Sequence, residues 1–220
     1  DGNGSSDSED ITLTVNSVND ATTLSAVGNH STDEDTDLTI SVSSSDADLA
    51  NYGEQHTFTL DCDAVSLVST SCVSTGSNTA DCTFDVQDHQ YGSASCTVSV
   101  SDGNGSSDSE DITLTVNSVN DCPVFEISDP QVTPEDEDLT IAVSSFDYDL
   151  ANYGESHTFT LECGEESLVQ TSCNSTGDNT ADCTFDVQLN QNSEDGIDCV
   201  LTVDDGNGCS YDQEFTFIVQ

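Results

Sequence analysis

Carboxylates in this chain gather at a few turns, where they could bind a hard cation. Asp46 and Asp48 follow one apolar stretch, Asp102 opens a DGNG turn, and Asn19 and Asp20 end a duplicated segment. Carboxylate and amide oxygens are the ligands that Ca²⁺ takes, at about six to eight per ion. The pattern therefore predicts calcium sites built from several turns.

We expect these sites to form at junctions between consecutive domains, with ligands from the domain before, the linker and the domain after. For the junction inside this chain the predicted ligands are Glu34, Asp35 and Asp88, then Asn120 and Asp121, then Asp147, Asp149, Asp204 and Asp205. Asp and Asn also favour turns for local reasons, so a solvated acidic surface is the alternative.

The charge balance gives a separate reason to expect a cation. The chain has 44 Asp and Glu residues, no Lys or Arg, and a formal net charge of −44. Such a chain cannot neutralise itself with internal salt bridges, and its compact state repels itself. A divalent metal, high salt or a basic partner must therefore supply positive charge. Nucleic acid is excluded as a partner, because binding its phosphates needs cationic side chains.

The ten cysteines indicate an oxidising compartment. No Cys-x-x-Cys pair is present, which argues against a zinc ribbon or a thioredoxin-type site. No apolar run approaches the length of a membrane span. We therefore expect an extracellular or cell-surface protein with disulfides and no membrane span in this segment.

An internal repeat sets the domain organisation. Residues 1–20 recur without change at 102–121, and the similarity continues through the following segments. A period near 100 residues fits a whole β-sandwich domain. We predict the final strand and linker of a preceding repeat at 1–20, one repeat at 21–121 and another at 122–220. Residues 1–20 could alternatively be a strand donated to a neighbouring subunit in a homopolymeric filament.

Apolar and polar residues alternate within each copy, which is the pattern of half-buried strands. The first copy has seven such stretches, at 22–27, 38–44, 56–62, 65–71, 82–87, 95–100 and 111–116. Seven short strands in about 100 residues favour an all-β, seven-stranded Greek-key sandwich of the immunoglobulin or cadherin-like type, repeated in tandem.

The strand map also suggests how the cysteines pair. Cys62 ends one predicted strand and Cys96 begins a neighbouring one, while Cys72 and Cys82 face each other across a hairpin. The second copy repeats both arrangements, which suggests Cys163 with Cys199 and Cys173 with Cys183. Each four-cysteine set allows three pairings, and the sequence leaves the choice open. Cys122 and Cys209 should pair, because their counterparts Ala21 and Ser106 both lack the thiol.

Several motifs together resemble the cadherin-like tandem repeats of large microbial cell-surface adhesins. They are VNSVND at 116–121 before Cys-Pro, DEDTDLTI at 33–40, SDAD at 45–48 and VSDGNG at 100–105. The resemblance covers essentially the whole chain. It implies calcium at the domain junctions, bound by the Asn-Asp linker, the Asp-x-Asp pair and the DGNG aspartate. The disulfides and the absence of Lys and Arg depart from the common bacterial pattern, which leaves the calcium stoichiometry open.

We expect a structural role, as a segment of a calcium-stabilised, disulfide-linked fibre or adhesin stalk whose partners are other repeats of the same chain. The sequence does not indicate an enzyme, because His56 and His157 lie in no recognisable catalytic motif. The alternative is a carbohydrate- or ice-binding module. It would use an exposed array that includes Thr113 and Thr115, while Tyr52 and Tyr153 could stack on sugars or pack beneath a loop.

Overall fold

The computed structural model describes residues 2–4, 6–49, 53–150 and 154–220. The chain divides into two compact units, residues 1–118 and 119–220. All the elements that follow are β-strands. Within the described ranges, no helix has the length and apolar character needed to cross a bilayer.

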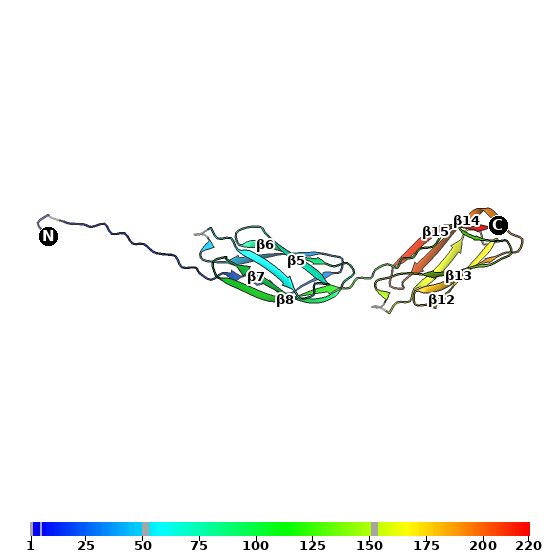
Figure 1. Ribbon diagram of the computed structural model, residues 1–220, viewed down its shortest axis with the longest axis horizontal. Coiled ribbons are helices and arrows are strands. Elements are labelled where there is room, and N and C mark those ends of the chain that lie inside the picture. The colour runs from blue at the N-terminus through cyan, green and yellow to red at the C-terminus, as the bar shows by residue number, and fades with distance from the viewer. Residues whose placement is uncertain (1, 5, 50–52, 151–153) are drawn as a thin grey trace. The chain divides into compact units, whose positions relative to one another are not determined.

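Two four-stranded sheets form the first unit, and Figure 1 shows β5 and β6 in one layer with β7 and β8 in the other. One sheet has the order β1-β3-β6-β5, with β1 (Thr23–Leu24), β3 (Leu38–Ser45), β6 (Thr79–Val86) and β5 (Val68–Ser74). The other has the order β2-β8-β7-β4, with β2 (His30–Asp33), β8 (Ser107–Asn117), β7 (Gly92–Ser101) and β4 (Thr57–Cys62).

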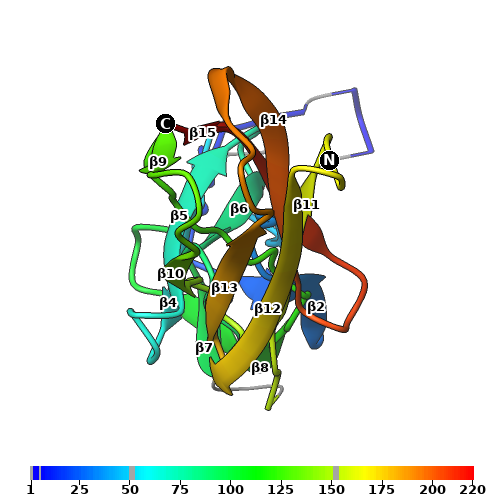
Figure 2. The same ribbon diagram turned by 90° about the vertical axis from the view of Figure 1, so that its right-hand side faces the viewer.

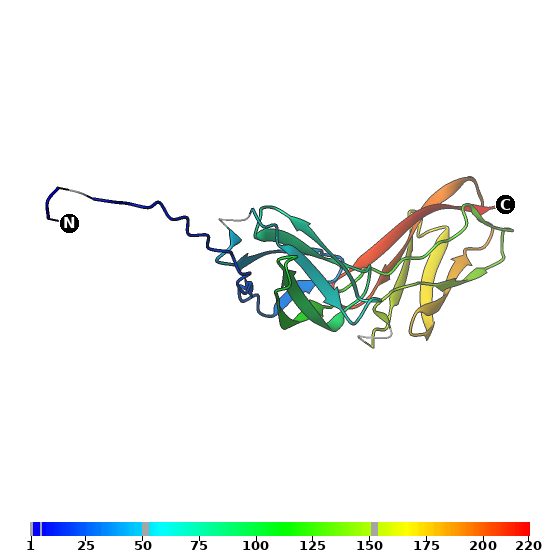
Figure 3. The same cartoon turned by 60° about the vertical axis from the view of Figure 1, so that its left-hand side comes forward.

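The second unit repeats this arrangement. Its first sheet has the order β10-β13-β12, with β10 (Leu139–Ser144), β13 (Thr180–Val187) and β12 (Val169–Gly177), and Figure 2 shows the last two side by side. Its second sheet has the order β11-β14-β15-β9, with β11 (Thr158–Cys163), β14 (Ser193–Asp204), β15 (Ser210–Val219) and β9 (Gln131–Thr133). The long β14–β15 hairpin stands out in Figure 3. An isolated bridge between Val124 and Phe146 replaces β1.

Strand alternation buries one face of each sheet, as the sequence predicts. On β8, for example, Ile112, Leu114 and Val116 are buried, and the residues between them are exposed. The two units have separate apolar cores, each formed by inward side chains from both of its sheets. Burial of this apolar surface is the main source of stability in such a sandwich.

The predicted first strand, 22–27, differs from the structure. It is limited to β1, and a second short strand, β2, pairs in parallel with β8 in the opposite sheet. Gly28, with φ of 76°, lies between the two strands, and this conformation lets the chain change sheets at little steric cost. The sequence does not predict β2, because its residues, HSTD, lack apolar alternation.

Five disulfides form, and they are the pairs suggested by the strand map: Cys62–Cys96, Cys72–Cys82, Cys163–Cys199, Cys173–Cys183 and Cys122–Cys209. The first four join directly opposed residues of neighbouring strands. These four therefore link strands within a sheet and do not connect the two sheets of a sandwich.

Residues 6–20 contain no strand, although 6–16 have the same sequence as β8. Ile11, Leu13 and Val15 are 83–87% exposed, whereas their counterparts on β8 are at most 3% exposed. Local sequence alone therefore does not form this strand, which needs a partner strand and a core.

Candidate metal centre at the linker end of each sandwich

The aspartate of the DGNG turn organises one end of the first unit. Asp102 Oδ1 accepts hydrogen bonds from the backbone N–H groups of Asn104 (2.7 Å) and Ser106 (3.0 Å). Its other oxygen, Oδ2, accepts one from the side-chain amide of Asn19 at 2.9 Å. One carboxylate thus shapes the β7–β8 turn and holds the linker that enters the unit.

The Asp-x-Asp pair holds the next linker residue. The N–H of Asp20 donates to Asp48 Oδ2 at 2.7 Å, and the N–H of Asp48 donates to Asp46 Oδ1 at 2.8 Å. A surface hollow at this end is lined by Asn19, Asp48, Glu54, Asp102 and Asn104 among others. The five ligands predicted for this end, Asn19, Asp20, Asp46, Asp48 and Asp102, therefore lie in one hydrogen-bonded network.

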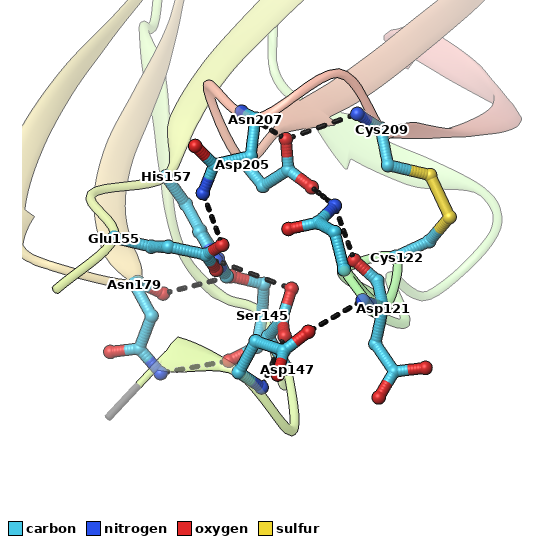
Figure 4. A network of polar contacts seen from close by, with 12 residues as sticks. Asp121, Cys122, Ser145, Asp147, Glu155, His157, Asn179, Asp205, Asn207 and Cys209 are labelled. Atoms are coloured by element: carbon cyan, nitrogen blue, oxygen red, sulfur yellow. Dashed lines mark hydrogen bonds and ion pairs between the residues drawn. A yellow bond between two sulfur atoms is a disulfide. The ribbon is translucent and has the colours of Figure 1, made fainter. Parts of the chain in front are cut away.

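The second unit builds the same network, drawn in Figure 4. Asn120 donates to Asp205 Oδ2 at 2.7 Å, and the N–H of Asp121 donates to Asp149 Oδ2 at 2.5 Å. The N–H of Asp149 donates to Asp147 Oδ1 at 2.7 Å. Both units thus bring together the linker Asn-Asp, the Asp-x-Asp pair and the turn aspartate.

The turn aspartates are poised to stay ionised. The amide of Asn19, with backbone N–H groups of the turn, holds the pKa of Asp102 below its ordinary value of 3.8. Burial alone would raise the pKa of Asp205, but hydrogen bonds from Asn120 and from the N–H groups of Cys209, Asn207 and Gly208 outweigh it and lower that pKa. Both carboxylates therefore carry negative charge at neutral pH.

A buried histidine lies behind each linker network. In the second unit, His157 Nδ1 is 2.6 Å from the Ser145 hydroxyl, and its Nε2 is 3.6 Å from one oxygen each of Asp147 and Glu155. These three side chains have no exposed surface. In the first unit, His56 Nδ1 is 2.6 Å from Ser44, and its Nε2 is 3.8 Å from Glu54.

The donor chemistry and several unsatisfied atoms fit a bound cation. Asp46 Oδ2, Asn120 Oδ1 and Asp147 Oδ2 are buried and have no hydrogen-bond partner within the described part of the chain. Unpaired buried oxygens are costly, and a metal ion is one way to satisfy them. The sequence holds no Lys or Arg that could do so.

Three of the other predicted ligands belong to the end of the first unit where β8 finishes, and the fourth, Asp204, belongs to the second unit. Glu34 is buried and Asp88 is exposed, and both lie at the end of the first unit opposite its incoming linker. There the backbone N–H of Glu34 donates to the carbonyl oxygen of Asn117, the last residue of β8. At the same end, Asp35 has φ of 58° and accepts a hydrogen bond from the N–H of His89. Asp204 is exposed, and its Oδ1 accepts from Gly206 instead of joining the Asp205 network.

Sequence reasoning missed the roles of Glu54, His56, Glu155 and His157. The available signal was the Gly-Glu-x-His stretch at 53–56 and again at 154–157, just before β4 and β11.

Of the four residues named for a carbohydrate- or ice-binding module, the structure describes the two threonines. Tyr52 and Tyr153 lie outside the described residues. Thr113 and Thr115 are exposed on β8, but the residue at the position of Thr115 in the second copy is Ile218. A regular hydroxyl array is therefore not repeated from copy to copy.

The sequence matches no protein-family model and no curated protein. Solved structures similar to the chain include protocadherin gamma B2 extracellular cadherin domains 3–6 (15% identity, TM-score 0.53) and PcdhgB3 EC1-4 (13%, 0.54). The protocadherin gamma B4 extracellular domain is also similar (16%, 0.51). These alignments cover 90%, 91% and 94% of this chain and 47%, 50% and 33% of the other chains. The fold is thus a cadherin-like, immunoglobulin-like β fold, and with its five disulfides it fits an extracellular β-sandwich module.

Proposed function

We propose that this chain is a structural segment of an extracellular repeat fibre or adhesin stalk, built from tandem Greek-key sandwiches and stabilised by calcium. The observation that carries the proposal is the duplicated polar network at the linker end of each unit. The same side chains meet in both copies, and the chain has no Lys or Arg to balance their negative charge. The proposed role is mechanical, with no catalytic step.

Calcium fits this network because its donors are carboxylate and amide oxygens from three separate segments. In the second unit Asn120, Asp121, Asp149 and Asp205 would hold the ion, and in the first unit Asn19, Asp20, Asp48 and Asp102 would do so. An ion bound there would tie the incoming linker to the sandwich. Glu34, Asp35 and Asp88 stay predicted ligands of the domain that precedes a junction.

The exposed apolar face of residues 6–20 supports a second element of the proposal, strand donation. Ile11, Leu13 and Val15 have the alternation of a strand that is buried when it completes a sandwich, as the same sequence does in β8. A neighbouring subunit could accept this strand by pairing at a sheet edge. The resulting assembly would be a homopolymeric filament.

Small-angle scattering of the full chain, with millimolar calcium and then with chelator, tests the structural proposal. Calcium that ties linkers to sandwiches should narrow the distribution of interatomic distances, and chelation should broaden it reversibly. Magnesium at the same concentration controls for general screening, because it prefers a smaller, water-rich coordination shell. Curves that superimpose with and without calcium would contradict the proposal.

A further inference from the structure

The buried histidine clusters carry ligand atoms that the calcium network does not use. Each cluster contains one aspartate, one glutamate and one histidine: Asp46, Glu54 and His56 in the first unit, and Asp147, Glu155 and His157 in the second. The three ligand atoms of each cluster lie within 4.8 Å of one another. The same triad thus forms twice, at equivalent positions.

The converging atoms are buried and unsatisfied. In the second unit Asp147 Oδ2, Glu155 Oε2 and His157 Nε2 are inaccessible to solvent and have no hydrogen-bond partner within the described ranges. The remaining polar atoms of the same side chains do have partners: the N–H of Asp149 donates to Asp147 Oδ1, and the Asn207 amide donates to Glu155 Oε1. The three atoms therefore converge on a common centre, and the chain has no Lys or Arg that could neutralise the two carboxylates.

The hydrogen bonds behind the ring prepare His157 as a ligand. The Ser145 hydroxyl can donate to the carbonyl oxygen of Asn179 (3.3 Å) and accept from Nδ1–H of His157 (2.6 Å). This arrangement leaves the Nε2 lone pair facing the carboxylates. Metal-bound histidines generally donate their other ring N–H in this way, which fixes the tautomer and the ring orientation.

From this geometry we infer that each sandwich binds a zinc-type divalent ion through its Asp-Glu-His triad. Two ligands about 2.1 Å from zinc, at an angle of about 110–120°, lie about 3.5 Å apart. The distances from His157 Nε2 to the two carboxylate oxygens are both 3.6 Å. Imidazole nitrogen suits zinc and similar transition ions, whereas calcium takes about six to eight oxygens.

The ion would connect the two sheets of a sandwich. Asp147 follows β10 in one sheet, while Glu155 and His157 precede β11 in the other. The in-sheet disulfides do not make this link, so the site adds a cross-sheet connection. The inference does not depend on the stalk proposal, because the triad lies within one unit and none of its three residues is among the four assigned to calcium there.

Zinc binding to the full, metal-stripped chain tests the inference, measured by calorimetric titration in saturating calcium so that oxygen-rich sites are filled. We expect two zinc ions per chain, one in His157→Gln and none in the double variant His56→Gln/His157→Gln. His30→Gln is the matched control, because this histidine belongs to neither triad, and it should retain two ions. Loss of a ligand should weaken binding by more than about 100-fold, since outer-shell partners alone account for about 10–100-fold.

Glu155→Gln guards against a histidine variant that fails to fold, because glutamine can still accept the hydrogen bond from Asn207. It should retain the circular dichroism spectrum of the parent chain and lose one zinc ion. Cobalt can replace zinc as a spectroscopic probe, and its visible bands should halve in Glu155→Gln. Zinc uptake that is absent from the parent chain, or unchanged in the double histidine variant, would overturn the inference. The first result would indicate that a protonated histidine satisfies the carboxylates instead.

Discussion

The two sandwiches share a fold and a polar network but differ in how tightly the linker end is held. In the first unit the N–H of Thr22 donates to the hydroxyl of Ser106 at 2.9 Å. In the second unit the Cys122–Cys209 disulfide joins the same two segments. A covalent bond has thus replaced a hydrogen bond at the point where the linker enters the domain.

The buried Asp-Glu-His triad is also more compact in the second unit than in the first. His157 lies 3.6 Å from both carboxylates of its triad, and Asp147 is buried. His56 lies 3.8 Å from Glu54, and Asp46 is only partly buried. The comparison indicates that a covalently fixed linker end accompanies a more compact set of ligand atoms. We therefore expect the second unit to bind its ion more tightly than the first.

Removing the extra disulfide should have the largest effect on this comparison. Cys122→Ser/Cys209→Ser opens a loop with a sequence separation of 87 residues. It should lower the free energy of unfolding of the second unit by about 4 kcal/mol, because the reduced chain gains conformational entropy when unfolded. Chemical denaturation of the full chain should show one shifted transition and one unchanged transition.

The reciprocal variant, Ala21→Cys/Ser106→Cys, places the same bridge in the first unit and serves as the matched control. It should raise the stability of that unit, provided that the bond forms. Equal shifts in both transitions after removal of Cys122–Cys209 would contradict the view that each unit is stabilised separately.

A smaller effect is expected from the linker asparagines. Asn120→Ala leaves Asp205 Oδ2 without its amide donor, and we expect a loss of about 1 kcal/mol after allowance for solvent screening. Asn19→Ala removes the equivalent donor to Asp102, but Asn19 is exposed and the loss should be smaller. Paired thermal melts in chelator would measure the difference. A larger loss for Asn19→Ala would reverse the ranking of the two linker ends.

The smallest effect concerns pH in calcium-free buffer. Because folding lowers the pKa of Asp205 and Asp102, their contribution to stability is fully present above the unfolded value near 4. It should be lost as the pH falls from about 4 through the lower folded values. Asp205→Asn should flatten this part of the stability–pH curve. If stability falls with pH below about 4 as steeply in the variant as in the parent chain, other carboxylates cause that fall.

Much of the fold follows from alternation in the sequence. The inward residues of β8 and the opposed cysteines of β4 and β7 were predictable, because a strand repeats every two residues and neighbouring strands fix their partners. The switch from β1 to β2 was not predictable, because it depends on backbone conformation at Gly28. The linker asparagines and turn aspartates were identified by residue type and position.

The buried triads were not predicted as ligand clusters. Their members come from loops whose closeness depends on the packing of two sheets, and the repeated Gly-Glu-x-His stretch marks the position of Glu155 without showing that it is buried. Residues 6–16 illustrate the converse, because the sequence predicts a strand there and none forms, although the same sequence forms β8. Pairing partners and burial, more than local sequence, decide whether such a segment is a strand.

Differential scanning calorimetry of the full chain, in millimolar calcium and then in chelator, tests the central claim most directly. Ligand binding to the folded state alone stabilises it by mass action. If calcium holds the linker networks, both unfolding transitions should move to lower temperature in chelator and recover when calcium is restored. Transitions that coincide in both buffers would show that the acidic clusters are a solvated surface, and the calcium-stabilised account would be wrong.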